Sequence, residues 1–166
     1  MLPNIDVRLK NIVKAVQEVI APALPADEKL AQEQCRLIVG HIGMLQGQWK
    51  QAVRYEGGSF RLIRDLAESL VPHVDPQQAD ILRRALAETA AVDELDIDAL
   101  NAGICTIGHA VDKVILGEDG KKPLTRAAWD VILDYGEKDA LRSRVWFQGN
   151  GIDPDRANLP PLESVI

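Results

Sequence analysis

Apolar residues recur at the period of an α-helix along almost the whole chain, and this pattern restricts the fold more than any other feature. In the first segment they fall at positions i, i+4, i+7, i+8, i+11 and i+15 of one helix face: Ile5, Leu9, Ile12, Val13, Val16 and Ile20. No sustained alternation of apolar and polar residues is present, and aromatic residues make up only 4% of the sequence. Strands are therefore not expected, and the sequence predicts an all-α protein.

Proline, glycine and capping residues divide this pattern into six predicted helices. These are a first helix that ends at Pro22, a second over about 26–55, a short third that stops before Pro72, a fourth that starts at Pro76, a fifth over about 97–116 and a sixth over about 125–148. The break between the second and third is expected at Gly57-Gly58. We therefore predict a helical bundle of four long helices plus two shorter ones.

The chain of 166 residues is long enough for a single domain with a substantial core. We assign residues 1–148 to one helical-bundle domain. Residues 149–166 contain three prolines and no helical period, so they are predicted to form an extended C-terminal tail. The tail also carries apolar side chains that could lie across a neighbouring surface: Leu159, Leu162, Val165 and Ile166.

Charge and composition exclude several classes of partner. The net charge is −6 and the isoelectric point is near 5.1, whereas nucleic acid and anionic membranes require a basic face. The longest apolar stretch, 37–45, is much shorter than a membrane span, and the first ten residues do not read as a secretory signal. With only two cysteines, Cys35 and Cys105, a disulfide scaffold is not expected. These features predict a cytoplasmic protein with no nucleic-acid or membrane partner.

Three polar residues interrupt the apolar stripe of the second helix. Gln34, His41 and Gln48 are seven residues apart and fall above one another on a helical wheel. An unpaired buried polar group costs roughly 1–3 kcal/mol, so these side chains need partners if they are enclosed. They either bond to neighbours, backbone or an internal water, or line a small pocket in which His41 acts as a ligand or base, or lie where the helix reaches solvent. A small-molecule ligand is compatible with the second reading.

Several features of the sequence favour self-association. Gly40, Gly43 and Gly47 share the other side of the second helix and would allow another backbone to approach closely. The last helix carries a second apolar seam, formed by Trp146, Val131 and Tyr135, and the tail adds further apolar residues. We therefore predict a homodimer.

A second Gly-His pair lies on the fifth predicted helix. Cys105 and His109 are four residues apart and so lie on one face, with Asp98 and Asp112 in line with them. A thiol beside an imidazole and a carboxylate suits nucleophilic chemistry, and the same spacing suits a pair of metal ligands. The stripe also lies opposite the apolar face of its helix, so the alternative is a face exposed to solvent.

The segments "VGHIG" around His41 and "CTIGH" at 105–109 together resemble the DinB-like metal-binding bundles. In that family one histidine comes from the second helix and an H-x3-H pair comes from a later one; here Cys105 stands at the first position of the pair. The resemblance implies a divalent metal held by His41, Cys105 and His109.

The sequence therefore supports one predicted function and one alternative. The first prediction is a structural or interaction module that forms a homodimer, and the alternative is a metal- or small-molecule-binding bundle. The sequence lacks E-x-x-H, H-E-x-x-H, C-x-x-C, G-x-S-x-G and dinucleotide motifs. Whether the protein is an enzyme stays open.

Overall fold

The computed structural model describes residues 4–117 and 123–166, and these residues form helices, turns and connecting segments but no strand. The predicted all-α class is confirmed. The chain divides into two compact units: unit 1 comprises Met1–Gln51 and Trp146–Leu159, and unit 2 comprises Ala52–Val145 and Pro160–Ile166. The predicted division into one bundle domain, 1–148, and a tail, 149–166, stays a prediction.

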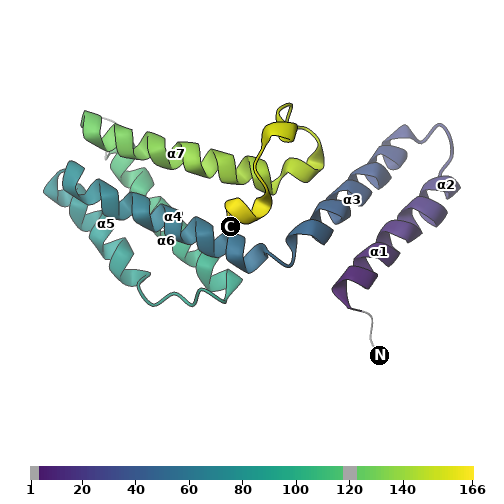
Figure 1. Ribbon diagram of the computed structural model, residues 1–166, viewed down its shortest axis with the longest axis horizontal. Helices are drawn as coiled ribbons and strands as arrows, with labels where there is room; N and C mark the ends of the chain where they lie inside the picture. The colour runs from purple at the N-terminus through teal and green to yellow at the C-terminus, as the bar shows by residue number, and fades with distance from the viewer. Residues whose placement is uncertain (1–3, 118–122) are drawn as a thin grey trace. The chain divides into compact units, whose positions relative to one another are not determined.

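Unit 1 is built on a hairpin of two antiparallel helical arms (Figure 1). The first arm comprises α1 (Ile5–Ala15), the π-helical turn η1 (Val16–Ile20) and α2 (Ala21–Ala23), and the second arm is α3 (Lys29–Gln48). The side chain of Asn4 accepts a hydrogen bond from the Val7 amide, as expected of a helix cap. In η1 the Ala21 amide donates to the Val16 carbonyl, and this wider turn lies directly before Pro22, which has no amide hydrogen to donate.

The predicted second helix, 26–55, is wrong at both ends. α3 begins at Lys29 and ends at Gln48, a turn covers residues 49–51, and α4 (Ala52–Leu70) follows. The predicted break at Gly57-Gly58 is also wrong, because α4 continues through both glycines. The helix that was predicted to be short is therefore 19 residues long.

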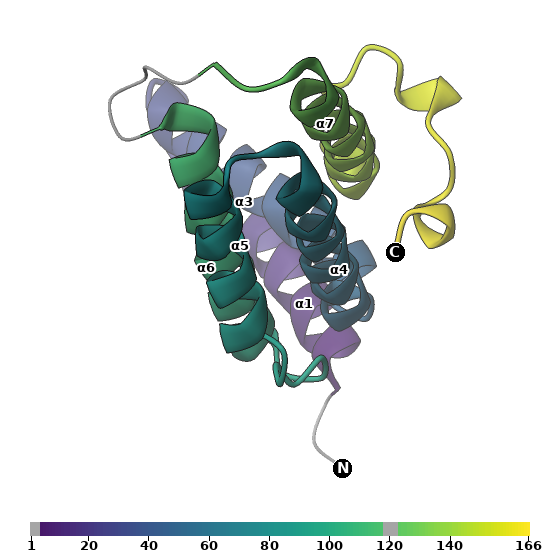
Figure 2. The ribbon, with the colours of Figure 1, turned by 90° about the vertical axis from the view of Figure 1, so that its left-hand side faces the viewer.

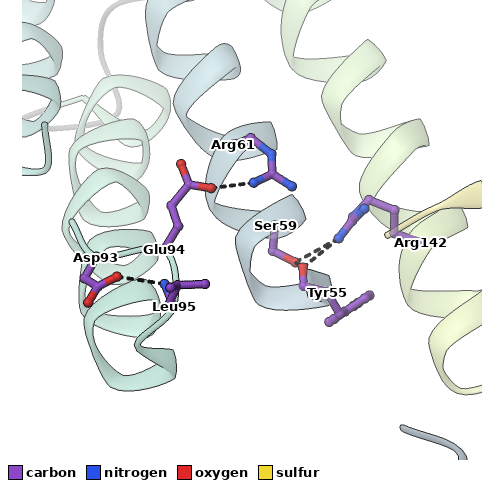
Figure 3. A network of polar contacts seen from close by, with 7 residues as sticks. All are labelled: Tyr55, Ser59, Arg61, Asp93, Glu94, Leu95 and Arg142. Atoms are coloured by element: carbon purple, nitrogen blue, oxygen red, sulfur yellow. Dashed lines mark hydrogen bonds and ion pairs between the residues drawn. The ribbon is translucent and has the colours of Figure 1, made fainter. Parts of the chain in front are cut away.

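The glycine at position 58 is explained by an arginine from a distant part of the chain. A Cβ atom on Gly58 would lie 2.6 Å from Nη2 of Arg142, so glycine makes room for the guanidinium against α4. Arg142 Nη2 donates to the Tyr55 carbonyl at 2.8 Å, and the guanidinium lies 4.9 Å from the centre of the Tyr55 ring (Figure 3). Arg142 Nη1 donates to the Val165 carbonyl. This arginine joins α4, α7 (Arg126–Trp146) and residues 160–166 within unit 2.

Substituting Gly58 with alanine is expected to be about 1–2 kcal/mol less favourable than the same change at an unobstructed helix position, because the new methyl group must shift the flexible Arg142 guanidinium away from its carbonyl partners, which offsets the gain in helix propensity. Gly40→Ala is the matched control, since a Cβ at Gly40 meets no atom within 4 Å. It should stabilise α3 by up to about 1 kcal/mol. Urea unfolding followed by circular dichroism measures both. Equal effects of the two substitutions would contradict the placement of Arg142.

Unit 2 has a core formed by α4, α5 (Pro76–Glu88) and α6 (Ile97–Leu116), which contact one another, with α7 adding side chains to it (Figure 2). Its most deeply buried large side chains are Phe60, Leu70, Leu82, Leu100, Ile107 and Val114. At Gly103 a Cβ would lie 2.7 Å from the Phe60 ring, so this glycine lets the ring pack directly on the α6 backbone. The core thus depends on close approach between α4 and α6.

The predicted helix ends in unit 2 are confirmed where a local motif sets them. Asp75, Pro76 and Gln78 form a capping box at the start of α5: the Asp75 side chain accepts from two backbone amides, and Gln78 Oε1 accepts from the Asp75 amide. The structure ends α6 at Leu116 and places Gly117 at its C-cap with φ 65°, a conformation that favours glycine.

The last helix differs from its prediction in the face that it buries. Val131 and Tyr135 of the seam predicted for self-association pack on the unit 2 core together with Ile132, whereas Trp129 and Leu133 are exposed. After α7 the chain forms three short 3-10 turns: Gln148–Asn150, Arg156–Asn158 and Leu162–Ser164. The Val165 carbonyl in the tail accepts a hydrogen bond from Arg142, while the predicted packing of the apolar tail side chains on a neighbouring surface stays a prediction.

By length and composition alone, α6 is apolar enough to cross a membrane, and it is the single such helix among the described residues. Its apolar side is part of the unit 2 core, where Leu100, Ile107 and Val114 are fully buried. Because a core helix of this kind passes the same test, the finding is weak evidence for a membrane span.

Candidate interaction surface

The residues of the first predicted pocket do not enclose a site. Gln34 and His41 lie exposed on α3, which agrees with the alternative that the helix reaches solvent at this stripe. Gln48 is half-buried, and its side-chain amide donates to the Trp146 carbonyl at 2.7 Å. The physical reason is that α3 packs through another face, on which Cys35 is buried.

The residues of the second predicted site also lie on an open face. Cys105 and His109 are exposed on α6, as are Asp98 and Asp112. His41 belongs to unit 1, whereas Cys105 and His109 belong to unit 2. Within 4–117 and 123–166 no group of three or more His, Cys, Asp or Glu side chains is placed to hold a metal ion. The arrangement therefore favours the reading of this stripe as a solvated helix face.

The two arms of the unit 1 hairpin are joined at one end by a cluster of polar contacts. Trp49 Nε1 donates to Asp6 Oδ1 at 2.9 Å, and Lys50 Nζ lies 2.7 Å from Asp6 Oδ2. The Lys50 ammonium also lies 5.3 Å from the centre of the Trp49 ring. The hydrogen bonds from Lys50 and then from Trp49 hold the pKa of the Asp6 carboxyl below its ordinary value of 3.8.

Acid should open this cluster. Because the pKa of Asp6 is lower in the folded hairpin than in the unfolded chain, its stabilising contribution is complete above about pH 3.8 and is lost as pH falls through the folded-state pKa. The Trp49 indole N–H resonance, followed by NMR against pH, should therefore titrate with a midpoint below 3.8. Asp6→Asn should abolish that titration, and a midpoint at or above 3.8 would contradict the contacts.

The seam between the arms buries few residues, and many large apolar side chains remain exposed beside it. Val16 and Cys35 are buried there, while Leu9 and Val13 are half-buried. The exposed set on one side of the hairpin is here named the hairpin face: Ile5, Ile12, Val19 and Ile20 of the first arm, and Leu30, Leu37, Ile38 and Leu45 of α3. Gln34 and His41 lie among the α3 members of this face.

The two rows of the hairpin face lie on the same side of the hairpin. At about 100° per residue, Ile12 is reached from the buried Val16 by a rotation of about −40°, and Ile38 from the buried Cys35 by about −60°. The arms are antiparallel, so the same sense of rotation about each helix leads to the same side. The opposite rotation leads to Gln17 and Arg36.

Gln17 and Arg36 do line one common cavity of about 300 Å³. The helical period places Gln17 and Arg36 on the side of the hairpin away from the hairpin face, and the cavity that both residues line agrees with this placement. Its walls include Val16 and Cys35 of the seam. The glycines of α3 also lie away from the centre of the hairpin face, and a Cβ on Gly40, Gly43 or Gly47 would meet no atom within 4 Å.

The start of the segment 146–159 lies beside the C-terminal end of α3. Gly149 lies beside the Met44 side chain, and Gln48 bonds to Trp146. Phe147 and Ile152 are exposed on this segment. Their apolar side chains extend the exposed apolar surface of unit 1.

Sequence reasoning did not identify this surface, because helical period places Ile5, Ile12 and Val16 on one helix face without showing which of them a second helix covers. The signal was present in the width of the apolar arc, which on α1 and α3 is wider than one partner helix can cover. Arg142 was also missed, and no local motif around it indicates its role.

The chain has no match among known protein families, curated proteins or solved structures.

Proposed function

We propose that this protein is a cytoplasmic structural or interaction module that forms a homodimer through the hairpin face of unit 1. The observation that carries the proposal is the exposure of eight large apolar side chains on the two arms, and the helical period supports their placement on one side of the hairpin. Scattered apolar residues are normal on protein surfaces, whereas a contiguous apolar patch of this kind marks an interaction site. The cytoplasmic location is proposed from the sequence alone, because two cysteines are too few for the disulfide scaffold of a small secreted domain.

The size of the hairpin face fits a protein partner. Two adjacent helices of about 20 residues present a surface about 30 Å long and about 20 Å wide, on the order of 600 Å². A typical stable interface buries about 800 Å² on each partner, so the hairpin face with its rim approaches what a dimer requires. A small molecule would cover only part of such a surface.

The chemistry of the surface favours a second copy over a nucleic acid or an anionic membrane. The centre of the hairpin face carries aliphatic side chains with two glutamines and a histidine, and the chain has a net charge of −6. A nucleic acid needs a basic surface. Two copies of the same aliphatic face are complementary to one another without any charge.

Light scattering after gel filtration tests the proposal on the complete chain over a series of concentrations. The expected mass is twice the chain mass of 18.2 kDa at micromolar concentration, decreasing on dilution. A mass of 18.2 kDa at every concentration would overturn the proposal.

A further inference from the structure

The α3 row of the hairpin face has the same pattern in both directions about His41. Gln34 and Gln48 stand seven residues on either side of His41, Leu37 and Leu45 stand four on either side, and Ile38 and Met44 stand three on either side. Reversing the helix about His41 therefore superposes polar on polar and apolar on apolar residues.

The first arm has a corresponding centre. Ile5 and Val19 stand seven residues on either side of Ile12, and Ile20 adjoins Val19 where the wide turn η1 adds to the helix circumference. A helix turned about Ile12 would therefore also place aliphatic side chains on aliphatic side chains.

The two centres lie at the same level of the hairpin. The bond from Trp49 to Asp6 fixes one level, and Val16 and Cys35, which line one cavity, fix another. At about 1.5 Å per residue, Ile12 falls opposite residue 43 when counted from the first level and opposite residue 39 when counted from the second, so it lies opposite the turn of α3 that contains His41. A single axis across the hairpin can therefore pass close to both Ile12 and His41.

Two symmetric ways of stacking one hairpin face on another then differ in energy. A two-fold axis parallel to the helices places α3 over the first arm of the second copy. Gln34, His41 and Gln48 would then meet isoleucines, at roughly 1–3 kcal/mol for each unpaired polar group. An axis perpendicular to the helices, in the plane of the interface, places each helix antiparallel on its own copy. This second axis places polar residues opposite polar residues on α3, and aliphatic residues opposite aliphatic residues on the first arm.

We propose that two copies pair through the hairpin face about a two-fold axis perpendicular to the helices, which passes by Ile12 and His41. This inference rests on the proposed function and adds the orientation of the partner. It places His41 opposite His41 of the second copy and Gln34 opposite Gln48 of the second copy. Gln48 already donates to Trp146 through its amide nitrogen, so its Oε1 atom is the acceptor for the Gln34 amide of the second copy.

Cysteine cross-linking on the full-length chain tests the orientation. In a Cys105→Ser background, which removes the exposed native thiol, one chain carries Gln34→Cys and a second, distinguishable by an affinity tag, carries Gln48→Cys. The chains are mixed and treated with a short bis-maleimide. In the antiparallel pair two copies of residue 34 are about 21 Å apart along the helix axis, so the mixed product is expected and the same-residue products are not.

Two further variants complete the experiment. His41→Cys should cross-link to itself, whereas Arg36→Cys, on the side of α3 away from the hairpin face, should not. Same-residue products at position 34 or 48 would overturn the antiparallel arrangement. A dimer by light scattering that gives none of the expected cross-links would overturn the orientation while the proposed function stands. A monomer in light scattering would overturn both.

Discussion

Replacing Leu100 with alanine is expected to lower the unfolding free energy by about 2–5 kcal/mol. Leu100 has no exposed surface, and it lies in the unit 2 core on α6. Truncation removes apolar contacts and leaves a cavity that the closely packed α4 and α6 can fill only in part. Urea unfolding followed by far-ultraviolet circular dichroism measures the loss.

Leu95→Ala is the matched control for this prediction. Leu95 lies five residues earlier in the loop before α6 and is 83% exposed, so the same truncation should change stability by less than about 0.5 kcal/mol. If Leu100→Ala costs no more than Leu95→Ala, the assignment of α6 to the core is wrong.

Replacing Ile38 with glutamate is expected to weaken the proposed dimer by about 100-fold or more. Ile38 is 44% exposed near the centre of the hairpin face, and a carboxylate there would be enclosed among aliphatic side chains. Breaking an interface in this way costs about 3 kcal/mol or more, and each 1.4 kcal/mol is a factor of ten in the dissociation constant. Light scattering over a dilution series measures the shift.

Val7→Glu provides a control with the same exposure and the same change of charge. Val7 is also 44% exposed but lies on α1 away from the hairpin face, so its substitution should leave the dissociation constant unchanged. Leu133→Glu tests the exposed apolar side of α7 in the same manner. Dissociation caused by Val7→Glu or Leu133→Glu, with Ile38→Glu without effect, would place the interface elsewhere.

Features set by neighbouring residues in sequence could be predicted, and features set by distant ones could not. The start of α5 at Asp75 and the end of α6 before Gly117 depend on local capping geometry, and both were predicted correctly. α4 continues through Gly57-Gly58, and the space that glycine leaves at position 58 is filled by Arg142, which is more than eighty residues away in sequence. Propensity alone therefore placed a break where a glycine makes room for a long-range contact.

The same limit explains the candidate sites. Helical period correctly placed Gln34, His41 and Gln48 in line on one stripe, but it cannot tell whether a second helix covers that stripe. In unit 1 the arms pack through Val16 and Cys35, so Gln34 and His41 stay exposed and only Gln48 is half-buried. The grouping of Cys105 and His109 on one face was likewise correct, and the face is open.

The route of the backbone determines how this protein can be dissected. The chain enters unit 2 at Ala52, leaves it after Val145 and returns at Pro160, so each unit is assembled from two stretches that are discontinuous in the gene. No single cut yields either unit whole. Isolating one by itself would need circular permutation or co-expression of two fragments.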